Sequence, residues 1–332
     1  MHCQNCQSQK VVKNGRTKRK DGSVVQKYLC KACTKQFNDR TGTPMSRLRT
    51  PCVIVSAALN VRTEGLGIRA TGRAVGKSHS TVIRWEERLA QQSNQWSPPA
   101  PAGADVTLEG DEVYTRVSEN PWPPEASEGW TINFIERESR YWVSAQAGKK
   151  ESHLFEQGTQ TAWEWVKQAQ FIRWFTDGER RYGKALWKLA SIYLKKGETP
   201  RHYPHRKVWR EGLEVAIKIK GSQGQKRVEW VYTEHPFTAI SAASEVHANH
   251  NEAQNSALRR RCSADRRRQN LYAKQVQGLQ RVLDVQRLVH NWVRPHWSLA
   301  KGTTPAMAMG FCNRPLSMHE LLTHRGFSFI ID

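Results

Sequence analysis

The chain lacks the two features that would mark an exported or membrane-bound protein. No stretch of its 332 residues approaches the roughly 20 consecutive apolar residues of a membrane-spanning helix. The opening Met1-His2-Cys3 does not begin the basic and then apolar segment of a signal peptide. We therefore expect a cytoplasmic protein that has no membrane partner.

Acidic residues are scarce relative to basic ones. The chain has 30 Asp and Glu against 52 Lys and Arg, a formal charge of +22, and residues 1–50 contain only Asp21 and Asp39 as acids. Release of counterions drives so basic a chain onto phosphate backbones, so a polyanion is the expected partner. Hydrophobic residues make up 38% of the chain, which allows cores for two or three domains and excludes a disordered basic tail.

Four of the seven cysteines form two Cys-x-x-Cys pairs near the start of the chain, Cys3 with Cys6 and Cys30 with Cys33. Four thiolates at such a spacing can surround one tetrahedral zinc ion. The alternatives are two disulfides or four inert thiols. A reducing compartment disfavours disulfides, and so short a segment with few apolar side chains scarcely folds without a metal clip. We predict a zinc ribbon over residues 1–45 that holds one structural Zn²⁺.

Residues 46–92 have the pattern of a helix-turn-helix. A first helix opens at Pro51, a second ends at Gly76, and Ser78 caps a third. The spacing predicts that the first helix buries Val53, Ile54, Ala57, Ala58 and Val61. The third helix would present four residues to a major groove: His79, Ser80, Thr81 and Arg84. The alternative is a small helical packing module.

A linker at 93–105, rich in Pro, Ala and Ser, separates this part from a segment with a different pattern. We predict strands at 106–117, 129–135, 141–147 and 171–175, and helices at 151–169 and from about 178 to 194. This order indicates a mixed α/β sheet. A later hairpin, 213–220 with 226–232, is joined by Gly221-Ser222-Gln223-Gly224.

Two acids occupy special places in that predicted sheet. Asp111 lies in the first strand and Asp177 at the carboxyl end of the fourth, where sites are built in open α/β sheets. Taken singly, Asp111 could be an edge-strand charge and Asp177 a turn or a helix cap.

A long basic helix is predicted from His247 onward. Glu252 and Arg259 are seven residues apart and share a face, so they could hold a metal ion and a phosphate. The alternative is an ordinary solvated helix. His247 and His250 are candidate ligands, although surface or capping roles are the simpler reading. An apolar stripe over 279–292 should pack on the sheet.

Taken together, these segments resemble the DDE transposases of bacterial insertion sequences, particularly those of the IS-one type. The resemblance covers nearly the whole chain and rests on six motifs in order: the Cys-x-x-Cys ribbon, Ser78–Trp85 of the helix-turn-helix, Asp111–Tyr114, Thr176-Asp177-Gly178, Asn251–Arg259, and Asn291–Leu299 with Thr304-Pro305.

The resemblance implies an RNase H-like catalytic domain over residues 106–310, with a C-terminal tail at 311–332. Asp111, Asp177 and Glu252 would be the catalytic triad, and Arg259 and Arg260 would contact DNA. Residues from about 195 to 244, which include the hairpin, would be an insertion. Carboxylates of this kind bind Mg²⁺ or Mn²⁺, and two ions would support in-line phosphoryl transfer.

The implied function is binding of the terminal inverted repeats of an insertion sequence, followed by metal-dependent strand cleavage and strand transfer into target DNA. Such an enzyme would work in the bacterial nucleoid as a homodimer or higher homo-oligomer. The alternatives are a sequence-specific DNA-binding regulator, an RNase H-like nuclease without strand transfer and a structural chromatin protein.

Overall fold

The computed structural model describes residues 2–18, 22, 24–118, 126–194, 207–220, 226–230, 235, 238–265 and 272–329. The chain forms two compact units. Unit 1 comprises residues 1–96 and 316–332, and unit 2 comprises residues 97–315. The division between 96 and 97 falls inside the segment predicted as a linker.

The first part of unit 1 is a small antiparallel sheet in the order β1-β2-β3. Its strands are β1 (Val11–Lys18), β2 (Val24–Cys30) and β3 (Gln36–Phe37). The core beneath them contains little besides two cysteines and Phe37, whose ring stacks on Tyr28 at 5.6 Å. Such a core is too small to hold the sheet by hydrophobic burial alone.

Helices make up the rest of unit 1. They are α1 (Cys52–Thr63), α2 (Ile68–Ala74), α3 (His79–Ala90), the 3₁₀ turns η1 (Ser93–Trp96) and η4 (Phe327–Phe329), and α9 (Met318–Thr323). Ser78 caps α3 by accepting a hydrogen bond from the backbone N–H of Thr81 at 3.3 Å. Gly76 ends the preceding turn with φ +63°, a conformation that glycine adopts without strain. Near the end of the chain, α9 packs on α1.

The predicted buried face of α1 is correct at Ala58 but wrong at Val53 and Val61. Val53 is 70% exposed and Val61 is 37% exposed, whereas Val55 and Leu59 are fully buried. The whole buried set is Cys52, Val55, Ala58, Leu59, Arg62 and Thr63. Apolar residues lie almost all round this helix, so their spacing does not select one face. Arg62 turns inward because its Nε donates to Oε1 of the buried Glu86 of α3 at 2.6 Å.

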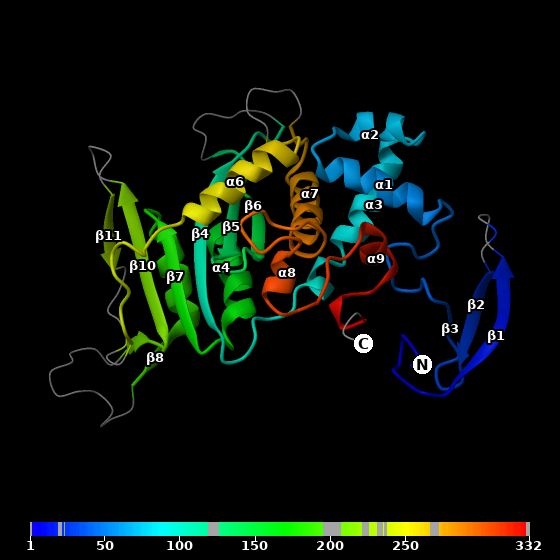
Figure 1. Cartoon of the computed structure of the whole chain (residues 1–332), viewed down its shortest axis with the longest axis horizontal. Coiled ribbons are helices and arrows are strands. Elements are labelled where there is room, and N and C mark those ends of the chain that lie inside the picture. Colours follow the sequence, from blue (N-terminus) through cyan, green and yellow to red (C-terminus); the bar gives the residue numbers. More distant parts are fainter. Residues whose placement is uncertain are drawn as a thin grey trace. The chain divides into compact units, whose positions relative to one another are not determined.

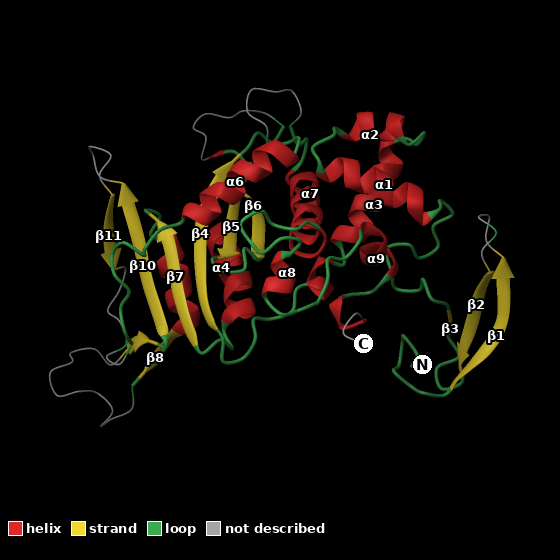
Figure 2. Ribbon diagram, viewed as in Figure 1, coloured by secondary structure: helices red, strands yellow, loops and turns green. Residues whose placement is uncertain are grey.

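Unit 2 is built on a six-stranded mixed sheet in the order β11-β10-β7-β4-β5-β6, which Figure 2 shows from one edge to the other. The strands are β4 (Asp105–Tyr114), β5 (Trp130–Glu136), β6 (Trp142–Gly148), β7 (Phe171–Asp177), β10 (Leu213–Lys220) and β11 (Lys226–Trp230). Strands β4, β5 and β6 pair antiparallel, whereas β7 pairs parallel to both β4 and β10. The predicted mixed α/β sheet is confirmed.

Helices cover both faces of this sheet (Figure 1). On one face lie α4 (Ser152–Val166) and α5 (Arg181–Ala190), which pack on each other. On the other, α6 (Asn249–Arg261) packs on β4 and β5, and α7 (Val276–Leu288) packs on β6. The predicted stripe of α7 does bury Leu279 and Leu283 against the sheet, and the chain then continues as a π-helical turn, η3 (Val289–Val293), and α8 (Pro305–Ala308).

Gly110 lets the sheet and its core approach closely. A Cβ at this position would lie 2.6 Å from the ring of Phe134 and 2.9 Å from the side chain of Thr176. The Phe134 ring in turn lies 4.7 Å from Trp174 and 5.5 Å from Tyr182. Gly110 therefore marks the point where this aromatic cluster packs against β4.

Two details differ from the sequence prediction. The helix predicted to run to about residue 194 ends at Ala190, because Ser191 turns to extended backbone and opens β8 (Ser191–Tyr193), which pairs with β9 (Lys207–Trp209). The predicted hairpin forms as β10 and β11, but β10 also joins the main sheet beside β7. The predicted turn at 221–224 lies outside the described residues.

Every helix in the described ranges falls short of the length and apolar character that crossing a bilayer would require.

Candidate metal centres

The four N-terminal cysteines lie together. Their Sγ atoms all lie within 4.8 Å of one another, with Cys3 to Cys33 at 3.5 Å and Cys6 to Cys30 at 3.6 Å. A tetrahedral zinc ion with Zn–S bonds of about 2.3 Å requires sulfur–sulfur distances of about 3.8 Å. All four residues are free thiols, so the arrangement fits a Cys₄ metal site.

The local backbone favours the thiolate form that binds metal. The backbone N–H of Asn5 donates to Sγ of Cys3 at 3.4 Å and lowers the pKa of that thiol to about 6. The backbone N–H of Lys35 likewise lowers the pKa of Cys33. A lowered pKa favours the thiolate, the form that binds metal. At Cys6 the backbone N–H of Ser8 also lowers the pKa, but hydrogen bonds with the other cysteines and burial outweigh it and raise the pKa to about 12.

A second group consists of three acids in unit 2. Asp111 of β4 and Asp177 at the end of β7 come from neighbouring parallel strands, in which Gly110 pairs with Thr176. Their carboxylates lie within 4.8 Å of each other and of the Glu112 carboxylate. Two of the three predicted triad acids are thus brought together, as the parallel pairing of their strands requires.

Glu112 is the member of this group that the sequence analysis missed. Adjacent residues of a strand point to opposite faces, so a neighbour of Asp111 is not expected to join it. The two carboxylates approach because Asp111 turns along the strand and accepts the backbone N–H of Glu112 at 2.9 Å. Glu112 is bound by Lys150 Nζ at 2.6 Å and by the hydroxyl of Tyr182 at 3.2 Å. The sequence feature that could have revealed Glu112 is its position directly after Asp111.

The acidic group carries unfavourable charge. Burial, reinforced by the charges of Asp177 and Glu112, raises the pKa of Asp111 to about 8. Burial and the charge of Glu112 raise the pKa of Asp177 to about 6, although Lys150 opposes that rise. Among the described residues, Oδ1 of Asp177 is buried and has no hydrogen-bond partner. These features fit a site for a divalent cation. The donors are hard oxygens, a cation would relieve their mutual repulsion, and one buried oxygen is unpaired among the described residues.

The third predicted acid, Glu252, does not join this group. It is exposed in the first turn of α6, although its charge contributes to raising the pKa of Asp111. The residue that α6 directs to Asp111 is Asn255, whose Nδ2 donates to Oδ2 of Asp111 at 2.7 Å. Burial raises the pKa of Asp265 to about 6, and the nearby charge of Arg259 opposes that rise. Arg260 is exposed at the end of the helix.

The two candidate histidines surround a buried carboxylate instead. Glu109 is fully buried and accepts the backbone N–H groups of His250 and Asn251 at 2.8 and 3.1 Å. Its Oε1 lies 2.7 Å from Nδ1 of His250, 3.5 Å from Nδ1 of His247 and 2.7 Å from Nε of Arg137. Burial raises the pKa of Glu109, but His250 and Arg137 outweigh it and the pKa lies below its usual value. Because a guanidinium already neutralises Glu109, this cluster is a helix cap rather than a cation site.

The residues predicted to contact DNA lie at the start of α3. His79, Ser80 and Arg84 are exposed, and Thr81 is partly buried. Beside them, a pocket of about 410 Å³ is lined by α2 and by the turn before α3, including Arg69, Arg73, Lys77 and Ser78. This part of unit 1 presents positive charge and hydrogen-bond donors together.

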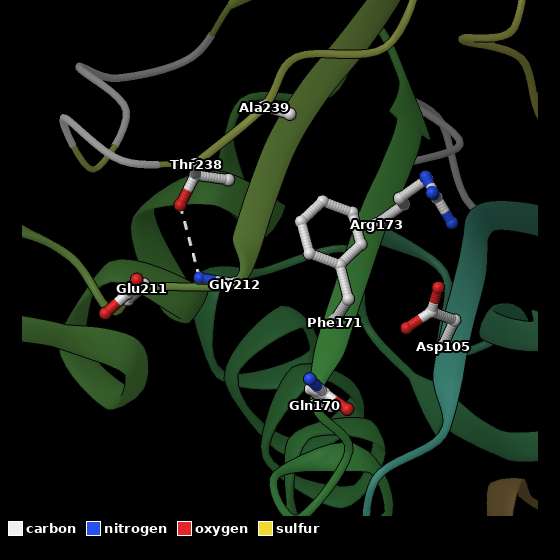
Figure 3. A pocket seen from close by; sticks show the side chains of 8 residues that line it. All are labelled: Asp105, Gln170, Phe171, Arg173, Glu211, Gly212, Thr238 and Ala239. Carbon is white, nitrogen blue, oxygen red and sulfur yellow. Dashed lines mark hydrogen bonds between the residues drawn. The ribbon is translucent and has the colours of Figure 1, made fainter.

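A larger pocket, of about 840 Å³, lies away from the acids, at the start of the parallel strands (Figure 3). Three of its lining residues lie where these strands begin: Asp105 opens β4, Phe171 opens β7, and Gly212 directly precedes β10. The N–H of Gly212 donates to Oγ1 of Thr238 at 3.2 Å. Asp105 and Asp111 are six positions apart in β4, about 20 Å along an extended strand. The hollow is therefore distinct from the acidic group.

No protein-family model matches the chain. A curated protein described as "Uncharacterized protein in transposable element ISH50", from Halobacterium salinarum, is 24% identical to it over 198 residues. The matched region covers 55% of this chain and 63% of the relative, so the chain spans less than two thirds of that protein's length. The chain is thus a distant homologue of a protein found in a transposable element.

Proposed function

We propose that the chain is a DDE-type transposase of an insertion sequence, similar to the IS-one type. In this proposal it binds the terminal inverted repeats of its element and catalyses metal-dependent DNA strand cleavage and strand transfer. The observation that carries the proposal is the meeting of the Asp111 and Asp177 carboxylates at neighbouring strands, with one buried oxygen unpaired among the described residues. The similarity to a transposable-element protein supports it.

The acidic group would hold Mg²⁺ or Mn²⁺, two ions in this proposal. Asp111 and Asp177 are the proposed shared ligands, and Glu112 is placed to contribute a further oxygen. Bound ions supply the positive charge that activates an attacking oxygen and stabilises a leaving one. Glu252 remains the proposed third acid of the triad, and Glu112 competes with it for that role.

The other residues have proposed roles in binding DNA. Arg259 and Arg260 would hold phosphate groups, which positions the strand without reading its sequence. His79, Ser80, Thr81 and Arg84 would contact base edges in a major groove. The four cysteines would hold one Zn²⁺ and thereby stabilise the ribbon over residues 1–45.

The remaining proposals concern architecture and assembly. Three antiparallel strands, a helix, a parallel strand and a second helix follow one another, as expected for an RNase H-like domain over residues 106–310. The partners are double-stranded repeat ends and target DNA in the bacterial nucleoid. Joining two ends in one reaction calls for a homodimer or higher homo-oligomer.

A second candidate is a sequence-specific DNA-binding regulator, and the position of Glu252 favours it. An exposed third acid outside the acidic group is what a domain without catalytic activity would show. The regulator would bind repeat ends without cutting them.

The test is a cleavage and joining assay on DNA that carries the natural flanks of the gene, with Mg²⁺, Mn²⁺ or EDTA. The wild type is compared with Asp177→Asn and with Asp105→Asn, an exposed acid at the start of β4 that serves as a control. Metal-dependent nicking and strand transfer that Asp177→Asn abolishes support the transposase. Cleavage without joining indicates the nuclease, and tight flank binding with no cleavage under any metal indicates the regulator.

A further inference from the structure

Asn255 makes the side-chain contact that orients Asp111. Its Nδ2 donates to Oδ2 of Asp111 at 2.7 Å, while Oδ1 of Asp111 accepts the backbone N–H of Glu112 at 2.9 Å. Asn255 is only 3% exposed, so water does not compete for this hydrogen bond. The carboxylate is therefore held at both oxygens, and each oxygen keeps a lone pair for another partner.

The orientation of the Asn255 amide is fixed by a chain of buried donors. The indole N–H of Trp142 can only donate, and it donates to Oδ1 of Asn133 at 3.3 Å. The Nδ2 of Asn133 then faces Oδ1 of Asn255, to which it donates at 2.8 Å. This leaves the amide nitrogen of Asn255 toward Asp111. Reversing either amide would set donor against donor or oxygen against oxygen. The series of hydrogen bonds therefore runs in one direction, from Trp142 to Asp111.

The backbone around Asn255 is held as firmly as its side chain. One turn earlier in α6, Nδ2 of Asn251 donates to the carbonyls of Glu109 in β4 and Asn133 in β5, at 2.8 and 2.9 Å. Glu109 also caps the helix, as described above. Asn133 and Asn251 are fully buried. These contacts tie the helix to both strands next to the acidic group.

We propose that Asn255 is a positioning residue for Asp111, the end of a one-way donor chain from Trp142 that holds this carboxylate ready for a divalent cation. The inference rests on the proposed role of Asp111 as a cation ligand. It explains why α6 turns Asn255, rather than Glu252, toward the acids: a neutral donor adds no further negative charge to a group that already repels itself.

The test measures Mn²⁺ binding to the full chain, with zinc bound and DNA absent, by isothermal titration calorimetry. Replacing the outer partner of a metal ligand typically weakens metal affinity about 10- to 100-fold, which is the expectation for Asn255→Ala. Trp142→Phe keeps an aromatic ring but removes the donor that sets the direction of the chain. It should weaken affinity about 2- to 10-fold, as for one neutral hydrogen bond. Asn249→Ala, at an exposed position of the same helix, should leave affinity unchanged.

The outcomes separate the inference from the function on which it rests. Binding by the wild type that Asp111→Asn abolishes, with Asn255→Ala and Trp142→Phe both as tight as the wild type, overturns the positioning role alone. Absence of Mn²⁺ binding by the wild type overturns the cation site and the inference with it. If Asn255→Ala does not fold, as circular dichroism would show, Trp142→Phe decides the matter, because the side-chain hydrogen bonds described for Trp142 lead to Asp111 through Asn133 and Asn255.

Discussion

Replacing Asp111 by Asn should stabilise the protein when no divalent cation is present. Burial and the neighbouring carboxylates move the pKa of Asp111 from 3.8 to about 8. A change of that size corresponds to about 5 to 6 kcal/mol of unfavourable free energy for ionising the group in the folded state. The pKa of Asp111 is higher in the folded protein than in the unfolded one. Its ionisation therefore costs no stability below pH 4, and the loss of stability grows as the pH rises toward 8.

The substitution also has a cost. An Asn at this position can still accept from Asn255, but its other end is an amide nitrogen that faces the backbone N–H of Glu112. Leaving that buried N–H without an acceptor costs about 1 to 3 kcal/mol. At pH 8.5 the net expectation is therefore a stabilisation of about 3 kcal/mol, and at pH 4 Asp111→Asn should be slightly less stable than the wild type.

Hydrogen exchange of the amides in β4 and β7, measured by mass spectrometry, is the suitable assay, because two units of one chain need not unfold together. Asp105→Asn, at the exposed first residue of β4, is the matched control and should change nothing. Saturating Mg²⁺ should remove most of this difference, since only the wild type gains stability by binding it, about 2.7 kcal/mol at a hundred times Kd. Faster exchange in Asp111→Asn than in the wild type at pH 8.5 without Mg²⁺ would refute the reasoning.

Three further outcomes are expected. Cys33→Ser should lower the bound zinc below one ion per chain and expose the amides of β1 and β2 to hydrogen exchange. The control Cys312→Ser should keep the ion. Equal zinc content in both variants would contradict the Cys₄ site. Arg62→Ala should lower the free energy of unfolding of unit 1 by about 3 to 5 kcal/mol in urea denaturation, because it removes the cation that lies 2.6 Å from the buried Glu86 carboxylate. A loss below 1 kcal/mol would contradict that account. Arg84→Ala should reduce discrimination between repeat-end and unrelated DNA by about 1 to 3 kcal/mol in fluorescence anisotropy titrations, and an equal loss for both DNAs would indicate a phosphate contact instead.

The order of elements in unit 2 could be predicted because its strands and helices have clear periods and clear ends. The inner strand β7 begins as a largely apolar run that the Asp177-Gly178 turn closes, whereas β4 mixes apolar residues with acids. The neighbouring positions of Asp111 and Asp177 follow from that pattern, because parallel strands bring their carboxyl ends to one edge.

The face of a helix was harder to predict than its existence. In α1, apolar residues occur on more sides than the core can use, and the buried pairing of Arg62 with Glu86 decides which side turns inward. A charged residue on the buried side is invisible to a search for apolar spacing. The partner lies 24 positions away, in another helix.

The composition of the acidic group was predicted only in part, for a similar reason. Glu112 depends on how Asp111 bends along its own strand, and Asn255 depends on a donor chain through β5 and β6. These are contacts between side chains distant in sequence, and local spacing does not encode them. The proposed triad member Glu252 came from resemblance alone, and its exposed position leaves its role to be tested.

The path of the chain through unit 1 has a consequence for how the protein is made. The backbone N–H of Met45 donates to the carbonyl of Leu322, and Nε of Arg325 donates to the carbonyl of Thr41. Domains fold as the ribosome delivers them, N-terminal first. Here the unit that begins first is completed last, because residues 97–315 must be synthesised before α9 can reach α1. A ribosome that stalls inside unit 2 would therefore leave an unfinished surface on unit 1 that is open to chaperones and proteases.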